Sequence, residues 1–527
     1  MPPGPQRQVF RFPSFSAGFR GLLQREGLTD ESYQGGYLAG CTNFHLIGRG
    51  RLKKRSGHRR HVTALPGGAN YIQGLAMYEF GQTRHLVSVV NGTIVRLNDT
   101  TWTAITGALT PPVGQNYISR FTQFSQGEAG AFLVGTGPNN TALWKWSGSG
   151  DATVLVPAGT TGPAYAGDIE EFYGRLWAVA TDAGNTITEF SDDGRADVWP
   201  TGNDFHATRS SLAVGLCKHN DGALLVFHQR SVHRVEPLYD SASRTPFGVY
   251  LVDGSVGAEG PHSIVNSKGV TYFASRTGFH RIRDPRYPAE YIGWPIEDYW
   301  NTLNQARSPY IFGFERGEPW NEIVWLVSTG SNTAHNAVVV YNTELDAWSV
   351  FTGLLAFNCG CNYTDADGKQ ITILGGNTGI VSEAWGDDNY ETGYVDAAYD
   401  EQTPITTTFK TGFLEWGYAG LKRLREMWLD MQLSDTKTFY FQVKGIADSP
   451  AVSQSKDIGA AGAAFGSFIF GVSAFAGSDP TQAKVIQSAK SRLFQLTLTE
   501  SDDGPAWTLN AIRFWWRPSG ARLKAVA

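Results

Sequence analysis

The sequence predicts an all-β fold: an irregular six- or seven-bladed β-propeller plus a C-terminal β-sandwich-like domain, with an N-terminal arm. Three observations predict it, namely a composition rich in glycine and aromatic residues, a repeated pair of short β-rich runs, and a change of pattern near residue 400. The 527 residues are too many for one ordinary domain. We expect an N-terminal arm and basic strand region over 1–80, the propeller over 81–400 and the sandwich over 401–527.

The composition favours many turns between short strands. Glycine contributes 61 of 527 residues, about 12% against a usual ~7%, and aromatic residues make up 13%. Charged residues are only 18%, and the chain lacks the straight-chain helix formers that a coiled coil needs. A hydrophobic content of 41% is ample for a core, which excludes intrinsic disorder.

Net charge and cysteine content exclude further classes of protein. A net charge of −5 gives no overall field that would attract nucleic acid or anionic lipid. Four cysteines are too few for a disulfide scaffold of this size, and for Cys359 and Cys361 a buried or edge-strand pair is favoured over a metal-ligand pair.

The chain shows no targeting or membrane signal. We find no run of 18 apolar residues, so we expect no membrane span. The N-terminal residues 1–5 (MPPGP) begin no apolar stretch of the kind found in signal peptides, so we expect synthesis in the cytoplasm.

The propeller prediction rests on a repeated hairpin. His85–Val90 is followed by Asn91-Gly92 and then by Thr93–Leu97, and Asn-Gly between two β-rich runs is a strong hairpin signal. First runs begin at residues 85, 131, 175, 223, 270, 322 and 370, a spacing of 44 to 52 that is typical of propeller blades. Two stacked β-sandwiches are the alternative. The further expected pairs are Ala131–Val134 with Ala142–Trp146, Arg175–Val179 with Thr186–Phe190, Ala223–Phe227 with Ser231–Val235, Val270–Ala274 with Phe279–Ile282, Glu322–Leu326 with Val338–Tyr341, and Gln370–Leu374 with Gly379–Val381.

The last third of the chain has longer alternating runs, which predict an antiparallel β-sandwich or jelly roll. A segment rich in Gly, Ala, Ser and Phe at 457–478 interrupts them and suits a long loop. The expected strands are Thr403–Gly412, Leu421–Met431, Phe439–Lys444, Leu493–Leu498 and Thr508–Trp516.

One segment is strongly basic. Asn43–His61 holds seven Lys or Arg, three His and no acidic residue, so the remainder of the chain carries −12. Such a segment suits contact with an acidic partner or a neighbouring subunit, whereas the alternative is an edge strand whose charges discourage unwanted pairing. The candidate docking residues are Arg49, Arg51, Lys53, Lys54, Arg55, Arg59 and Arg60.

Catalytic motifs are missing from the sequence, so we expect no enzyme, no cofactor and no metal site. There is no Walker A sequence, no HExxH and no GxSxG elbow. Asp365–Gly368 resembles the start of a calcium loop but lacks its later ligands, which favours a plain turn. Ser191–Trp199 resembles the Asp-box turn of sialidase propellers with a different spacing, and that turn is itself structural.

The order of several loose motifs resembles the tail nozzle, or tail stabilisation, proteins of short-tailed bacteriophages, a podovirus-type tail tube protein. The resemblance covers most of the chain. The motifs are Asn43-Phe44 leading into Gly50–Gly57, Phe190–Gly194 with Trp199, Gly222–Phe227 running into Ser231–Val235, Gly257–Ser263, Tyr272–Ser275 before Thr277–Phe279, and Lys490–Gln495.

The resemblance implies a structural protein of the virion tail rather than an enzyme. Six copies would form a homohexameric ring below the portal, in contact with the adaptor or head–tail connector ring and with tail fibre or spike proteins. Its lumen would retain the genomic DNA and pass it at ejection without sequence-specific binding, which a slightly acidic chain suits. Abundant Trp, Tyr and Arg suit large subunit interfaces.

Two alternative functions remain open at the level of sequence. One is a glycan-binding or glycan-degrading propeller of the receptor-binding or tailspike kind, which would carry a cluster of Trp and carboxylates on one propeller face. The other is a tail-tip scaffold protein of a long-tailed phage, which copy number and position in the virion would distinguish.

Overall fold

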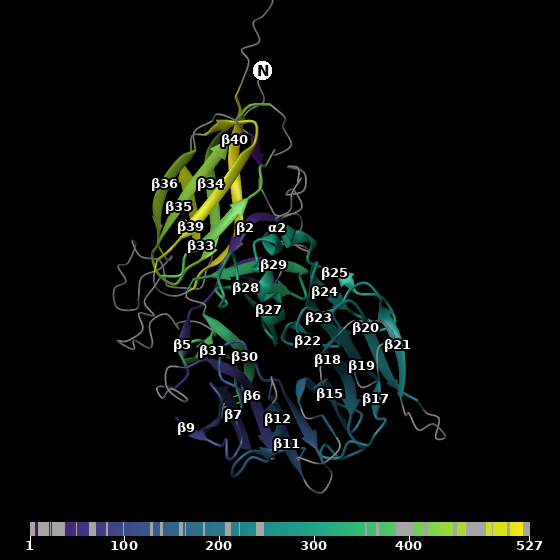
Figure 1. Ribbon diagram of the computed structural model, residues 1–527. Helices are drawn as coiled ribbons and strands as arrows, with labels where there is room; N and C mark the ends of the chain where they lie inside the picture. The colour runs from purple at the N-terminus through teal and green to yellow at the C-terminus, as the bar shows by residue number, and fades with distance from the viewer. Residues whose placement is uncertain are drawn as a thin grey trace, which may run out of the picture.

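The computed structural model is an almost purely β structure with two parts, a ring of sheets and a sandwich above it in the view of Figure 1. The predicted fold class, a β-propeller with a C-terminal β-sandwich-like domain, is confirmed. The structure describes residues 6–8, 21, 23, 37–48, 50–62, 70–80, 83–98, 100–126, 130–137, 141–156, 162–163, 165–182, 185–205, 212–220, 222–238, 247–353, 356–364, 368–385, 404–414, 420–445, 451–459, 481–486, 489–502 and 506–519.

Seven blades of four strands make up the propeller in the described part of the chain: six separate four-stranded sheets, and one that is part of a nine-stranded sheet. Blade 1 contains β6 (Ile72–Phe80), β7 (Thr83–Val90), β8 (Thr93–Asn98) and β9 (Thr101–Ala104), and blade 2 contains β10 (Phe121–Ser125), β11 (Ala131–Gly137), β12 (Thr141–Trp146) and β13 (Thr153–Val154). Blade 3 contains β14 (Ala166–Phe172), β15 (Arg175–Asp182), β16 (Asn185–Phe190) and β17 (Asp204–Phe205), and blade 4 contains β18 (Ala213–Asn220), β19 (Ala223–His228), β20 (Val232–Pro237) and β21 (Phe247–Asp253).

Blades 5 to 7 continue the series, with a short helical insertion between blades 5 and 6. Blade 5 contains β22 (Val265–Ser267), β23 (Val270–Ser275), β24 (Gly278–Ile282) and β25 (Glu290–Tyr291); blade 6 contains β26 (Phe312–Arg316), β27 (Glu322–Val327), β28 (Ala337–Asn342) and β29 (Ala347–Thr352); blade 7 contains β30 (Phe357–Thr364), β31 (Gln370–Gly376), β32 (Val381–Ala384) and β5 (His58–Arg60). The helical elements are η2 (Pro261–Ser263), η3 (Trp294–Ile296), α2 (Glu297–Asn301) and η4 (Gln305–Tyr310).

All seven predicted hairpins are confirmed as the second and third strands of the seven blades. In the first of them, Asn91 and Gly92 both have positive φ angles, 42° and 85°. A tight two-residue hairpin turn requires positive φ at both of its central residues. Asparagine and glycine adopt positive φ more easily than other residues, which explains the Asn-Gly sequence.

The ring closes through both ends of the propeller sequence. The innermost strand of blade 7, β30, packs against β6 of blade 1. The outermost strand of blade 7 is β5, which precedes blade 1 in the sequence and pairs with β32. Closure in this way shields the faces of the first and last blades from water, because each blade buries its faces only against neighbours.

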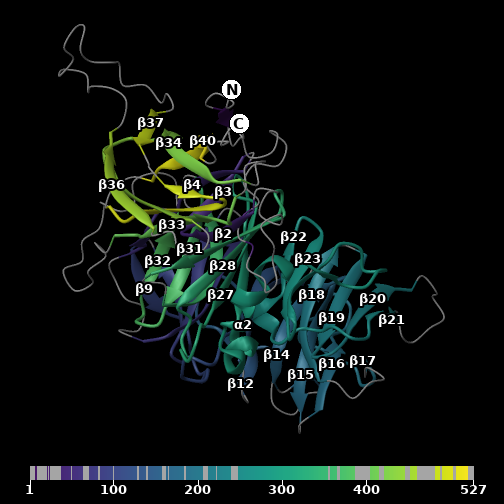
Figure 2. The same ribbon diagram turned by 90° about the horizontal axis from the view of Figure 1, so that it is seen from above.

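The sandwich combines strands from both ends of the chain. One layer is the sheet β3-β4-β40-β34-β37, joined by β1 and β38; the other is β2-β33-β39-β35-β36, which continues blade 6 through β29. Strand β2 lies between β29 and the sandwich strand β33, and Figure 1 labels the three strands where the propeller meets the sandwich. Figure 2 shows β2 and β33 side by side from above. The bounds are β1 (Gln6–Gln8), β2 (Leu38–Thr42), β3 (Phe44–Ile47), β4 (Arg51–Lys54), β33 (Thr407–Thr411), β34 (Lys422–Gln432), β35 (Lys437–Gly445), β36 (Val452–Ile458), β37 (Thr481–Ile486), β38 (Lys490–Ser491), β39 (Phe494–Glu500) and β40 (Thr508–Pro518).

The described residues within 1–80, where we expected an N-terminal arm and basic strand region, are divided between the two domains. Three of the strands in this region, β2 to β4, belong to the sandwich, β5 belongs to blade 7, and β6 is the inner strand of blade 1. The sequence pattern did not reveal this, because pairing partners more than 300 residues away decide which domain a short strand joins.

The hydrophobic core follows the same plan. Five clusters lie between successive blades, and the largest is shared by blades 5 and 6 and both layers of the sandwich. Most described tryptophans are in these clusters rather than at the surface, and Trp294, at 39% exposure, is the one exposed tryptophan in the described ranges. The tryptophans that we expected at subunit interfaces therefore mainly stabilise the single chain.

Candidate functional site

The basic segment is divided between the two domains. β4 lies inside the sandwich sheet between β3 and β40, and β5 is the outer strand of blade 7. Arg55 lies between these strands, and Arg49 lies outside the described residues. The edge-strand interpretation therefore applies to β5 and not to β4.

Lys54 is fully buried in the sandwich and forms an ion pair with Glu500. The Lys54 Nζ is 3.0 Å from Glu500 Oε2 and donates to the carbonyl oxygen of Asp502 at 2.9 Å. The indole N–H of Trp507 donates to the same Glu500 carboxylate at 2.8 Å. A buried ion pair is tolerated only when the remaining donors and acceptors are also satisfied, as they are around this carboxylate.

Arg55 and Asn43 connect blade 6 to the sandwich. The Arg55 Nε donates to Asn43 Oδ1 at 2.8 Å, and its Nη2 donates to the carbonyl oxygen of Thr352 at 2.9 Å. The amide of Asn43 donates to the carbonyl oxygen of Thr406 at 2.7 Å, just before β33. Asn43 has a φ of 63°, a conformation that asparagine tolerates better than most residues.

A second buried ionic group lies where β3 meets blades 6 and 7. Glu322 accepts from His45 Nδ1 and from Arg316 Nη1, both at 2.8 Å, and Arg316 also donates to the carbonyl oxygen of Trp385 at 2.7 Å. Burial would raise the pKa of Glu322, but His45 and Arg316 hold that pKa below its ordinary value. The pKa of His45 lies below its ordinary value, because burial together with the charges of Arg316 and Lys53 outweighs the opposing effect of Glu322. This group fixes the β3–β4 hairpin against the propeller.

Above this buried group lies a small pocket, which we call the junction pocket and define by Arg316, Trp320, Lys369, Glu383 and Trp385. Its volume is about 60 Å³. The Arg316 guanidinium lies 4.7 Å from the centre of the Trp320 ring. Small-molecule sites in proteins are about 300–1,000 Å³, so the junction pocket suits a single side chain of a partner rather than a substrate.

Two residues of the basic segment flank the junction pocket. The Lys53 ammonium lies 5.3 Å from the Trp320 ring centre. Arg59 donates to Glu383 Oε2 through Nε at 3.1 Å and Nη2 at 2.9 Å, and its side chain is 39% exposed. The rim therefore carries Lys53, Arg59 and Lys369 together with the carboxylates of Glu318 and Glu383, around the Trp320 ring.

The docking prediction is therefore wrong for three of its seven residues. Lys54, Arg55 and Arg60 are 0%, 3% and 8% exposed, so their charges serve contacts within the chain. Their burial did not follow from the sequence, because Glu500 lies 446 residues from Lys54. For exposed Arg51 and for Lys53 and Arg59, docking stays a prediction.

A second cluster, which sequence reasoning missed, lies on the inner strands of the propeller. Asp168 on β14 accepts from Arg120 Nε at 2.9 Å and from the backbone N–H of Leu216 on β18 at 2.8 Å, so one carboxylate joins blades 2, 3 and 4. Burial would lower the pKa of Arg120, but Asp168 raises it above its ordinary value. Burial raises the pKa of the neighbouring Glu170 to about 7. The available signal was the pair of acidic residues Asp168 and Glu170, which alternate around Ile169 in the short segment Ala166–Phe172.

Three further motifs from the sequence are the cysteine pair, the Asp-box-like turn and the calcium-loop-like segment. Cys359 is buried on β30, Cys361 is half-buried, and both are free thiols. The Asp-box-like turn is held against β15, where the backbone N–H of Leu176 donates to Ser191 Oγ at 2.9 Å. The calcium-loop-like acids at 365 and 367 lie outside the described residues.

No three His, Cys, Asp or Glu side chains in the described ranges are grouped as metal ligands would be. No helix in the described part of the chain is long and apolar enough to cross a membrane.

Comparison with known proteins assigns the chain to no family. No family model matches the chain, and no curated protein matches it. Similar solved structures include the extracellular domain of a putative hybrid two-component system from B. thetaiotaomicron (10% identity, TM-score 0.41, covering 80% of this chain and 55% of that one). The extracellular domain of a putative one-component system from the same organism is 11% identical, with a TM-score of 0.40 over 88% of this chain and 63% of that one.

A third similar structure is "YCF48 bound to D1 peptide", at 12% identity and a TM-score of 0.38 over 63% of this chain and 96% of that one. This chain thus spans between about half and nearly all of the length of these structures.

Proposed function

We propose that this protein is a structural subunit of a phage tail nozzle, a ring that extends the tail below the portal and adaptor and encloses the channel for genome retention and ejection. The order of the sequence motifs leads to this proposal. The observation that supports it best is the continuous nine-stranded sheet, which runs from blade 6 through β2 into the sandwich. A sheet shared by the two domains resists bending between them, which suits a subunit in the wall of a channel that holds packaged DNA.

The first motif of the resemblance supports the proposal at residue level. Asn43 hydrogen-bonds to the segments that carry Thr352 and Thr406, one from each domain. Arg55 completes the same network. These residues therefore have a structural role at the place where the two domains join.

The decisive experiment is to count copies in the particle. Phage particles whose genome encodes the chain are purified, and the protein is quantified by mass spectrometry against the portal, with cryo-EM of the tail as the second measurement. Six copies per tail below the adaptor are expected. Absence from particles, or a stable monomer that never enters them, would refute the proposal; a few copies at the tip of a long tail would identify the scaffold alternative instead.

The docking role is tested at the junction pocket. Because Lys53 packs on Trp320 and the exposed Lys369 lines the pocket, the double variant Lys53→Glu/Lys369→Glu is expected to fold but to reduce incorporation into tails by at least about tenfold, since like charges in an interface disfavour binding. Arg286→Glu, at an exposed site on blade 5, is the matched control. Normal incorporation of the double variant would contradict docking at this pocket.

Charge reversal at Lys54 and Arg55 does not test docking. Both residues are buried, and reversal would leave Glu500 and Asn43 without their partners. Loss of tails in such variants would report misfolding.

A further inference from the structure

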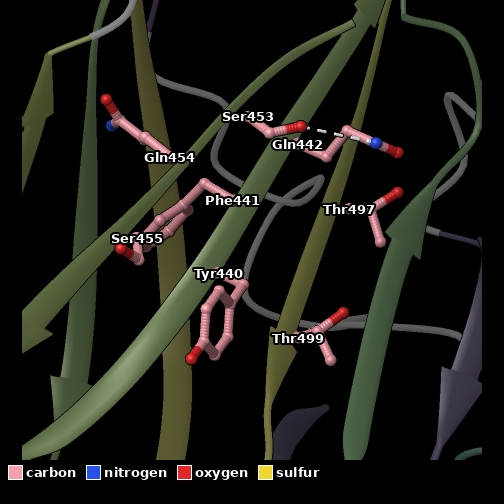
Figure 3. A pocket seen from close by; sticks show the side chains of 8 residues that line it. All are labelled: Tyr440, Phe441, Gln442, Ser453, Gln454, Ser455, Thr497 and Thr499. Atoms are coloured by element: carbon pink, nitrogen blue, oxygen red, sulfur yellow. Dashed lines mark hydrogen bonds between the residues drawn. The ribbon is translucent and has the colours of Figure 1, made fainter.

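A second surface, distant in sequence from the junction pocket, lies on the outer face of the sandwich. It is a pocket of about 400 Å³ over strands β35, β36 and β39, and Figure 3 shows the side chains that line it. We call it the polar face and define it by six side chains. They are Tyr440, Gln442, Ser453, Ser455, Thr497 and Thr499.

Strand register places these side chains in two rows. Tyr440 lies between Ser455 on one side and Thr499 on the other. Gln442 lies between Ser453 and Thr497 in the same way. Residues directly opposite one another share a face of the sheet with Cβ atoms about 5 Å apart, so the six form one continuous patch.

The patch is rigid because its strands are anchored from below. The residues that alternate with Tyr440 and Gln442 are Phe439, Phe441 and Val443, each at most 1% exposed. A ligand that binds above them would therefore meet groups already held in place, and little conformational entropy would be lost on binding.

The chemistry of the polar face is neutral, with one aromatic ring. None of its six members carries a charge, and every one can both donate and accept a hydrogen bond. Tyr440 is 51% exposed and presents an apolar ring with a polar tip. Gln442 and Ser453 make one long contact with each other, at 3.5 Å, so their hydrogen-bonding groups stay accessible.

A sugar chain matches this arrangement better than other ligands do. A pyranose has an apolar face of C–H groups, which stacks on an aromatic ring, and hydroxyl groups around its edge, which pair with amides and hydroxyls. Two cations border the patch on the same face, Lys410 opposite Thr497 and Lys444 two residues beyond Gln442 on β35, so a polyanion would contact the rim of the patch rather than its six neutral members. Partner proteins that add a strand would use the sheet edge at β36, where Lys456 and Asp457 discourage such pairing.

We propose that the polar face is a binding site for a neutral carbohydrate chain, with Tyr440 as the stacking residue and Gln442, Thr497 and Thr499 as hydrogen-bonding partners. The site is on the sandwich and not on the propeller. It does not depend on the proposed role in a phage tail, and either proposal can fail without the other.

The test measures binding of neutral sugars to the full chain. Maltohexaose, cellohexaose and the hexamer of N-acetylglucosamine are titrated by calorimetry and by saturation-transfer NMR. At least one is expected to bind, and Tyr440→Ala is expected to weaken that binding by about tenfold or more, the size of one aromatic contact. Tyr440→Phe keeps the ring and is expected to stay within about threefold of the natural protein.

Controls separate this result from misfolding and from other ligands. Tyr287→Ala removes a more exposed tyrosine on the propeller, at 67% exposure, and is expected to leave sugar binding unchanged. The proposal is overturned if none of the three sugars binds or if Tyr440→Ala has no effect on their binding. It is also overturned if Tyr440→Ala instead weakens binding to heparin or DNA, or changes the oligomeric state, which would assign the face to a polyanion or to a second copy of this chain.

Discussion

The propeller and the sandwich are both built from antiparallel strands, but they join residues at very different distances along the chain. In the propeller, Asp168 joins neighbouring blades by contacts 48 residues away on either side, to Arg120 and Leu216. In the sandwich, Lys54 pairs with Glu500 across 446 residues. The comparison shows that the propeller is assembled from successive local units, whereas the sandwich depends on the two ends of the chain meeting.

The largest expected effect follows from breaking the long-range pair. Lys54→Met removes the ammonium but keeps a chain of similar length, which leaves the Glu500 carboxylate buried without its cation. Breaking a buried pair in this way costs about 3–5 kcal/mol. Thermal unfolding should show a markedly lower Tm, together with loss of the signal from buried Trp507.

Lys53→Met is the matched control, because this neighbour is half-buried and packs on Trp320 at the surface. Its loss should lower stability by under about 1 kcal/mol. Equal effects of the two substitutions would contradict the assignment of Lys54 to the core. Adding Glu500→Gln to Lys54→Met should restore part of the stability, since the uncompensated charge is then removed.

A smaller effect is expected at the propeller axis. Asp168→Asn keeps the shape of the side chain but removes the negative charge of the carboxylate. That carboxylate accepts hydrogen bonds from Arg120 Nε and from the backbone N–H groups of Ile169 and Leu216. Hydrogen bonds to a charged group contribute about 1.5–3 kcal/mol, and here the Arg120 side chain is 21% exposed, so water offsets part of the loss. Urea denaturation should show a loss of unfolding free energy for Asp168→Asn that is smaller than the loss for Lys54→Met.

The control for this position is Asp193→Asn, in an exposed turn of the same blade, where little change is expected. If Asp168→Asn proved as harmful as Lys54→Met, the distinction between local and long-range ties would fail.

The smallest effect is expected to be a dependence on pH near the propeller axis, because the Glu170 side chain is only half-buried and water offsets part of the cost of its charge. The Glu170 carboxyl has an ordinary pKa of 4.5, and burial raises it to about 7 in the folded protein. Between these values the folded state binds a proton that the unfolded state has released, so Glu170 makes stability fall as pH rises from about 4.5 to about 7. Glu170→Gln removes this loss, so its Tm should exceed that of the natural protein by an amount that grows over this range and levels off above pH 7.

Glu318→Gln, at a carboxylate whose side chain is 80% exposed, serves as the control and should follow the natural protein at every pH. A Tm difference for Glu170→Gln that is constant from pH 4.5 to 8 would show that the carboxyl does not titrate as described.

What could be predicted from the sequence is what depends on neighbours in the chain. The hairpins were predictable because a strand, a turn such as Asn91-Gly92 and a second strand lie within about 20 residues, where residue alternation and turn chemistry carry the information. The spacing of those hairpins then indicated a ring of blades. The strands of the sandwich were found for the same reason.

The candidate sites were predictable only in part. The density of positive charge in residues 43–61 pointed to the junction between the domains, but not to which cations face outward. Lys53 reaches the surface and Lys54 the core because successive residues of a strand point to opposite faces, and the partner strand decides which face is buried.

The sequence by itself determined the fold class, the seven hairpins and the position of the basic segment, because these follow from local patterns. The tertiary structure decided the rest. It brought Glu500 to Lys54, placed β5 in blade 7 and β2 between two domains, and brought Tyr440, Gln442 and Thr497 onto one face. Long-range strand pairing is selected by the free energy of the whole core, which no short stretch of sequence contains.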